Sequence, residues 1–273
     1  MQSKTKKHPG LRVNLASEFL DRTVLIDIYL PRNHQPETQY SLLLINDGQD
    51  LPKFDLGALL ADMEGKGEIE PLIVVGIHCS EDRKMEYGTV AYTDYMGRGA
   101  RAGKHQQFVF DELLPYLRAQ YAPQGFKEKS YAGFSLGGLT AIDVVWNNPH
   151  EFRRAGVFSG SLWWRLNDIG KGYIEKTDRI MHKQIREGKY HPWLKFYFTT
   201  GSLDETMDRN NNGIIDSIDD TLGLIEELEK IGYSVTEDIF YINYKDGRHD
   251  VETWGRAMPE FLRWGWGSER REA

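Results

Sequence analysis

Short apolar runs of strand length alternate along this chain with segments of helical periodicity, and this alternation constrains the fold more than any other feature. Residues 40–45 and 71–77 are almost continuously apolar, as expected of strands buried on both faces. Residues 107–117, 136–146 and 252–264 are candidate helices. The other predicted strands are residues 23–30, 129–132, 156–158, 195–200 and 239–244. The pattern predicts an α/β fold in which helices cover both faces of a mostly parallel sheet.

A chain of 273 residues is long enough to bury a large core without disulfide bonds. It has no internal repeat and no low-complexity linker, so the sequence predicts one domain over residues 1–273. Residues 163–192 are polar and helical in pattern, and we expect them to form a small insertion over the active site. Cys79 is the only cysteine, which excludes an intrachain disulfide and suits a core position at a strand end.

Charge and hydropathy argue against several classes of protein. The formal net charge is −7 and the basic residues are scattered, so a nucleic-acid-binding surface is not expected. No run of about 18 apolar residues is present, so no membrane span is expected. Residues 1–8 have no apolar stretch behind them, unlike a signal peptide. We expect a cytoplasmic protein, and the sequence leaves its oligomeric state open.

A Gly-x-Ser-x-Gly motif, Gly133-Phe-Ser-Leu-Gly137, lies between a predicted strand and a predicted helix. In a nucleophile elbow the serine occupies a strained turn, and bulky residues two positions before or after it would collide. The two glycines remove both collisions, so Ser135 is the predicted nucleophile. The alternative is a glycine-rich turn with a surface serine. The backbone N–H of Leu136 begins the next helix and is predicted to donate to an oxyanion.

The other members of a triad follow the serine in the chain order acid, then histidine. His249 alone among the eight histidines comes after the last predicted strand, and it is the predicted general base. The acid should follow the strand that ends at Thr200, where Asp204 and Glu205 are both candidates. We favour Asp204 because a short carboxylate close to the strand end is easier to hold rigid. The backbone N–H of Gln49 is the predicted second oxyanion donor.

Taken together, these segments resemble the putative-esterase family, which includes esterase D-like, enterochelin-esterase-like and feruloyl esterases and mycolyltransferases. The resemblance is carried in the family's order by residues 44–49, 74–77, 111–116, 131–138, 158–164 and 248–254. It implies an α/β-hydrolase fold and esterase chemistry. The residues it implies are Ser135, His249 and Asp204 for catalysis, with the backbone of Gln49 and Leu136 as the oxyanion hole.

Two departures from the family pattern, Asn46-Asp47 before the glycine and Arg248 beside the histidine, bear on the substrate rather than on the mechanism. The sequence therefore predicts a serine esterase that acts on a small-molecule ester without an organic cofactor. An acyltransferase with the same triad is the nearest alternative. A non-catalytic binding protein of the same fold is disfavoured, because a binding module need not keep serine, acid and histidine in this order.

Residues 208–219 fit the calcium-loop pattern D-x-[DN]-x-[DN]-G-x5-[acid]. The predicted ligands of a structural Ca²⁺ are Asp208, Asn210, Asn212, Asp216 and Asp219, with the backbone carbonyl of Ile214. The alternative is an asparagine-rich turn that caps a helix over residues 221–231, with Asp219 or Asp220 as the N-cap. Trp163 and Trp164 are candidates for lining the pocket, with core packing as the alternative.

Overall fold

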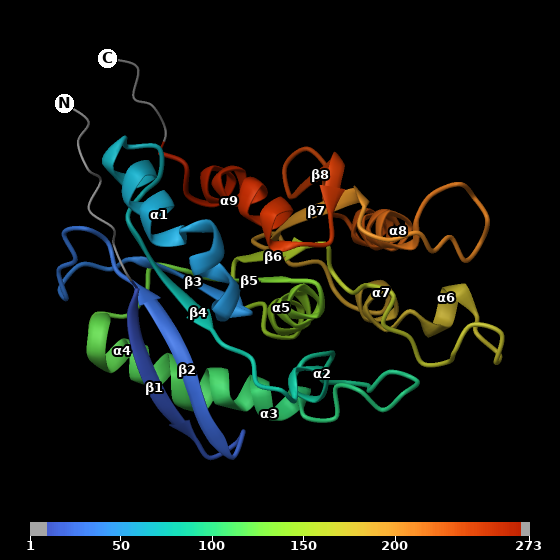
Figure 1. The fold of residues 1–273 in the computed structure, drawn as a ribbon, viewed down its shortest axis with the longest axis horizontal. Coiled ribbons are helices and arrows are strands. Elements are labelled where there is room, and N and C mark those ends of the chain that lie inside the picture. Colours follow the sequence, from blue (N-terminus) through green and yellow to red (C-terminus); the bar gives the residue numbers. More distant parts are fainter. Residues whose placement is uncertain (1–9, 269–273) are drawn as a thin grey trace.

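The computed structural model describes residues 10–268, which form eight strands and the helices around them (Figure 1). Residues 1–8, which the sequence analysis compared with a signal peptide, lie outside this range. The strands are β1 (Leu11–Ser17), β2 (Arg22–Tyr29), β3 (Ser41–Asn46), β4 (Leu72–Ile77), β5 (Lys129–Phe134), β6 (Arg154–Phe158), β7 (Lys195–Leu203) and β8 (Ile239–Arg248). They make one sheet in the order β1-β2-β4-β3-β5-β6-β7-β8.

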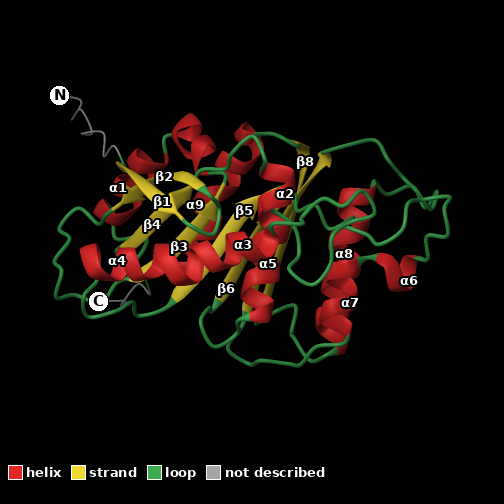
Figure 2. Ribbon diagram, turned by 90° about the horizontal axis from the view of Figure 1, so that it is seen from below, coloured by secondary structure: helices red, strands yellow, loops and turns green. Residues whose placement is uncertain are grey.

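The sheet is parallel from β4 to β8, and only the pairings β1–β2 and β2–β4 are antiparallel (Figure 2). This is the mixed, mostly parallel sheet of an α/β-hydrolase fold, as the sequence predicts. The carboxyl ends of the parallel strands lie on one edge, and in an open α/β sheet the loops at that edge form the binding site. The fold therefore brings the loops after β3, β5, β7 and β8 to the same edge.

Alternate residues of the buried strands feed two separate cores, one on each face of the sheet. In β3, Leu43 and Ile45 pack into one core while Leu42 and Leu44 pack into the other. Figure 1 shows α1 (Leu56–Gly65) and α9 (Val251–Trp266) on the first face. The helices on the second face are α3 (Ala102–Gln107), α4 (Leu114–Tyr121), α5 (Leu136–Asn147), α7 (Ile180–Arg186) and α8 (Asp216–Lys230). The continuous apolar runs in the sequence follow from this double burial.

The sequence analysis did not find the strand β1, the helix α1 or the short helix α2 (Arg83–Glu86). The strand β1 lies at the sheet edge, where most of its residues are exposed or half-buried, so its apolar signal is weak. The helix α1 follows a 3₁₀ helix, η1 (Gly48–Phe54), that contains Pro52. A proline and a turn sequence at that point hide the start of a helical pattern.

Two helical expectations are refined. The helix predicted over residues 107–117 is three consecutive pieces, α3, a π-helical segment η2 (Phe108–Leu113) and α4, with Pro115 in the first turn of α4. The backbone stays helical from η2 into α4, so Pro115, which has no N–H to donate to the preceding turn, lies where the hydrogen-bonding pattern changes from π-helical to α-helical. Residues 163–192 contain α7 and the short helix α6 (Glu175–Asp178), joined by loops. Between residues 10 and 268, no helix is long and apolar enough to cross a membrane.

Candidate active site

Ser135 lies in a strained turn between β5 and α5, with φ 54° and ψ −122°. A Cβ atom on Gly133 would lie 2.3 Å from the carbonyl oxygen of Gly137. On Gly137 it would lie 2.6 Å from Oδ2 of Asp47. The local geometry is that of a nucleophile elbow, and it explains why glycine stands at both positions. Non-glycine residues in such conformations are concentrated at functional sites.

The serine opens into a cleft of about 280 Å³ at the carboxyl edge of the sheet. Its lining combines residues that follow β5, β6, β7 and β8 with one residue of α8, Ser217: Ser135, Ser159, Gly160, Ser161, Trp163, Asp204, Glu205, Ser217 and His249. The three residues predicted as a triad thus share one cleft. Trp163 lines it as well, whereas Trp164 is fully buried and belongs to the core.

His249 follows β8, which runs to Arg248 and so carries the imidazole to the cleft. Its ring packs edge-on against Trp254, with ring centroids 5.3 Å apart and an interplanar angle of 84°. The residue is solvent-exposed, but the atoms packed around the ring partly desolvate it, and this desolvation lowers the pKa of His249. The nearby Asp204 carboxylate acts in the opposite direction on that pKa, and Arg83 acts in the same direction as desolvation.

Asp204 and Glu205 both reach the cleft, but their surroundings differ. The Asp204 carboxylate accepts a hydrogen bond from the backbone N–H of Gly201 at 3.0 Å and interacts electrostatically with His249. The backbone N–H of Ser217 favours the charged form of Glu205, whose charged neighbours are other carboxylates. Burial raises the pKa of both groups. Of the two carboxylates, only Asp204 has a significant electrostatic interaction with the histidine.

The Ser135 hydroxyl lies 3.4 Å from the hydroxyl of Ser161, which is its hydrogen-bond partner among residues 10–268. The two predicted oxyanion donors, Leu136 and Gln49, are not among the residues that line the cleft. Leu136 is the first residue of α5, so its N–H has no acceptor within the helix. Gln49 lies in η1, and its side-chain amide is held by Cys79 through both the thiol and the backbone N–H.

One feature of the site was missed by the sequence analysis. Arg83 donates two hydrogen bonds of 2.7 Å to Asp47, whose backbone is left-handed (φ 61°). The same guanidinium donates to the backbone carbonyl of Phe134, beside the nucleophile, at 3.3 Å. Burial disfavours its charge, but the Asp47 carboxylate outweighs burial and raises the pKa of Arg83. Arg83 therefore ties the loop that carries Gln49 to the elbow.

Asp47 comes directly after the buried strand β3 and is itself buried, so its carboxylate needs a cation, but nothing in the sequence identifies Arg83 as the partner. From the sequence, Arg83 and Glu86 are expected either to pair with each other and organise their loop or to form a solvated charged stretch. In the structure Glu86 is fully buried and pairs with Arg22 at 2.7 Å, so the two residues serve different partners.

The predicted calcium loop is not supported. Asp208 accepts hydrogen bonds from the backbone N–H groups of Asn212 and Gly213. Asp216 and Asp219 lie 3.2 and 3.5 Å from the guanidinium of Arg209. Over residues 10–268, no three or more His, Cys, Asp or Glu side chains are grouped so that they could hold a metal ion.

The guanidinium of Arg209 thus supplies the positive charge that the calcium prediction assigned to a metal ion. Its side chain is only 5% exposed, and it also pairs with Glu175 and Asp220. The alternative N-cap is wrong as well, because α8 begins at Asp216 and not after Asp219 or Asp220. Asn210 and Asn212 donate side-chain hydrogen bonds to Asp219, which closes the turn.

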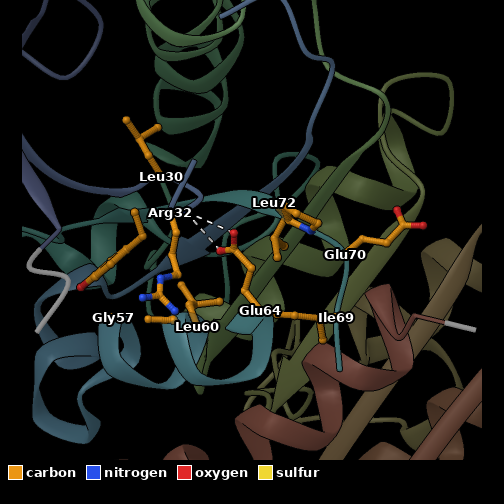
Figure 3. Close-up of a pocket in the computed structure, with 11 residues that line it drawn as sticks. Leu30, Arg32, Gly57, Leu60, Glu64, Ile69, Glu70 and Leu72 are labelled. Carbon is orange, nitrogen blue, oxygen red and sulfur yellow. Dashed lines mark hydrogen bonds between the residues drawn. The ribbon is translucent and has the colours of Figure 1, made fainter. Parts of the chain in front are cut away.

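A second, smaller pocket lies where β2 ends and β4 begins (Figure 3). Because β4 is parallel to β3, this is the amino end of the strands and the edge opposite the serine. Glu64 of α1 accepts hydrogen bonds from the backbone N–H of Arg32 across it. Its lining includes no serine, histidine or cysteine, so it offers none of the nucleophile chemistry of the first cleft.

Comparisons with known proteins agree with this architecture. The uncharacterized protein YjcH of Bacillus subtilis (strain 168) is 21% identical over 219 residues, which cover 78% of this chain and 81% of that protein. Enterochelin esterase from Shigella flexneri has a similar structure, with a TM-score of 0.70 and 22% identity over 94% of this chain and 58% of that chain. An IroE-like serine hydrolase from Shewanella oneidensis gives 0.69 and 20% over 94% of this chain and 80% of that chain.

At such identities the solved structures bear on the fold alone, and this chain spans about three-fifths of the length of the Shigella flexneri enzyme. The sequence itself matches the family described as "Putative esterase" over residues 17–264. That match includes every residue that lines the cleft. The chain therefore belongs to the putative esterase family of carboxylic ester hydrolases.

Proposed function

We propose that this protein is a serine esterase that cleaves small-molecule carboxylic esters through an acyl-enzyme, with Ser135 as nucleophile, His249 as general base and Asp204 as the acid. The observation that carries the proposal is the strained elbow at Ser135, which opens into the same cleft as His249 and Asp204. The electrostatic interaction of Asp204 with His249 further supports Asp204 as the acid of the triad.

In the proposed reaction the Ser135 hydroxyl turns from Ser161 to His249, which takes its proton as the serine oxygen attacks the ester carbonyl. The negative charge on the carbonyl oxygen is stabilised by the backbone N–H groups of Leu136 and Gln49. His249 then returns the proton to the leaving alcohol. Water attacks the acyl-enzyme by the same route and restores the serine. No organic cofactor takes part.

For the substrate, we infer an ester whose acyl or alcohol part packs beside Trp163, the aromatic side chain of the cleft. The name of the Shigella flexneri relative, enterochelin esterase, refers to a small-molecule ester and is compatible with this inference. Hydrolysis of p-nitrophenyl esters of rising chain length measures the size of the acyl site.

The test of the nucleophile combines a rate with a covalent adduct. Ser135→Ala should lower kcat by several powers of ten with an unchanged circular dichroism spectrum, because the step that forms the acyl-enzyme is lost. A fluorophosphonate should add once to the parent, at Ser135, as read by mass spectrometry. His249→Asn should lose activity to a comparable degree, whereas His150→Asn on the exposed surface is the matched control. Activity of Ser135→Ala within tenfold of the parent would overturn the proposal.

A further inference from the structure

Trp254 lies in the first turn of α9, directly behind His249, and is 7% exposed. Hydrogen bonds at the start of α9 fix the position of Trp254. The side chain of Asp250 accepts a hydrogen bond from the backbone N–H of Thr253 at 2.9 Å, and Thr253 Oγ1 accepts from the backbone N–H of Arg248 at 2.9 Å. The chain on either side of His249 is thus tied to the turn that carries the indole.

The indole contacts the surroundings of both other members of the proposed triad. It stacks on Phe134, the residue before the nucleophile, with ring centroids 5.0 Å apart and an interplanar angle of 11°. The indole Nε1–H donates to Ser159 Oγ at 3.2 Å. Together with the edge-on contact to His249, one side chain therefore reaches the elbow, the base and the loop after β6.

Ser159 connects the indole to the acid. An indole N–H can only donate, so the Ser159 oxygen accepts from Trp254 and its single proton is free to point elsewhere. Ser159 and Asp204 line the same cleft, and the Ser159 hydroxyl opposes the rise that burial causes in the pKa of Asp204. Oδ1 of Asp204 is buried without a close hydrogen-bond partner among the described residues. The proton of Ser159 and the imidazole are donors available to that carboxylate.

We propose that Trp254 is a positioning residue for the triad, which orients the Ser159 proton toward Asp204 and holds the His249 ring between the acid and the elbow. The inference rests on the proposed function, since it assigns a role within the same site. Hydrogen bonds donated to a carboxylate favour its charged form. Trp254 thereby keeps Asp204 ionised and able to support the imidazolium that forms during the reaction.

Trp254→Phe keeps an aromatic ring against His249 and Phe134 but removes the N–H donor. We expect kcat to fall about tenfold with little change in KM, because the Ser159 proton is then no longer oriented toward Asp204 and the hydrogen bond that it can donate to that carboxylate is lost or weakened. The low-pH limb of kcat/KM should move to higher pH, because a carboxylate with one fewer donor holds its proton more tightly. Ser159→Ala should give the same shift, and the double variant should be no worse than the worse single one.

Trp264→Phe is the matched control, because it makes the same chemical change in the same helix against Tyr197 and Phe261. It should keep the parent's rate and pH profile. A kcat and a pH profile of Trp254→Phe like those of the parent would overturn the inference. So would a double variant whose loss in kcat equals the product of the losses of Trp254→Phe and Ser159→Ala. If Trp254→Phe does not fold, Ser159→Ala decides by its pH profile. An active Ser135→Ala would instead refute the proposed function, so the two failures are distinguishable.

Discussion

Two adjacent carboxylates, Asp204 and Glu205, reach the same cleft, and their neighbours separate their expected roles. Asp204→Asn should lower kcat by about four powers of ten, because an amide in place of the acid favours the wrong imidazole tautomer. Glu205→Gln should keep most of the activity, since its charged neighbours are acidic and its backbone partner Ser217 can still donate to an amide oxygen. Steady-state kinetics on both variants make the comparison. The reverse ranking would move the acid to Glu205.

At the scale of single residues, the glycine spacing and the position after the last strand are local or topological signals, so the sequence alone puts forward Ser135 and His249, and the structure brings both to one cleft. It leaves Asp204 and Glu205 unresolved, since their difference depends on which of them faces His249. The pair of Arg83 and Asp47 could not be predicted from spacing, because the two residues lie on loops after different strands. Only the tertiary fold brings their side chains together.

At the scale of elements, the elbow depends on the close approach of β5 and α5. Gly133→Ala should destabilise the protein by about 1–3 kcal/mol and lower kcat, because its Cβ would meet the backbone of Gly137 and no side-chain rotation can relieve that clash. Gly103→Ala in α3 is the matched control. Its Cβ would have Val90 as nearest neighbour at 3.9 Å, so it should be neutral or stabilising by about 0.5–1 kcal/mol. Urea unfolding and kcat of both variants test this; equal stability of the two would contradict the steric explanation.

The sequence predicts a strand reliably where both faces of that strand are buried, and less reliably where one face is exposed. The central strands β3 and β4 are found because every residue in them is buried, which produces an almost continuous apolar run in the sequence. The edge strand β1 has exposed positions and is missed. The loop over residues 208–219 shows a different failure, in which a ligand pattern in the sequence cannot reveal that Arg209 turns inward to its carboxylates.

At the scale of the whole molecule, buried histidines make stability depend on pH. His105 is 1% exposed, and its Nε2 lies 3.0 Å from the hydroxyl of Tyr131, which donates in turn to Asn46. The imidazole is therefore the donor in that contact. Burial lowers the pKa of His105 to about 4. The unfolded chain binds a proton near pH 6.5 and the folded chain does not, so stability is lost as pH falls from about 6.5 to 4.

His105→Gln should remove this dependence and keep a donor for Tyr131. Between pH 7 and 4, its free energy of unfolding should fall by about 3 kcal/mol less than that of the parent. Burial also raises the pKa of Asp143 to about 6, which has the opposite sign, but this contribution is common to both proteins and cancels in the difference. Urea unfolding across this pH range is the measurement, with His150→Gln as the surface control. Parallel curves for variant and parent would refute a neutral, buried His105.

The order of the strands also governs when the protein can become active during its own synthesis. Ser135 and His249 lie 114 residues apart in the chain, and they meet only when β8 adds to the sheet beside β7. A nascent chain that has not yet made β8 holds a strained serine with no base and an open strand edge on β7. Any such unfinished chain is therefore expected to be inert toward esters, and catalytic competence arrives only with the last strand.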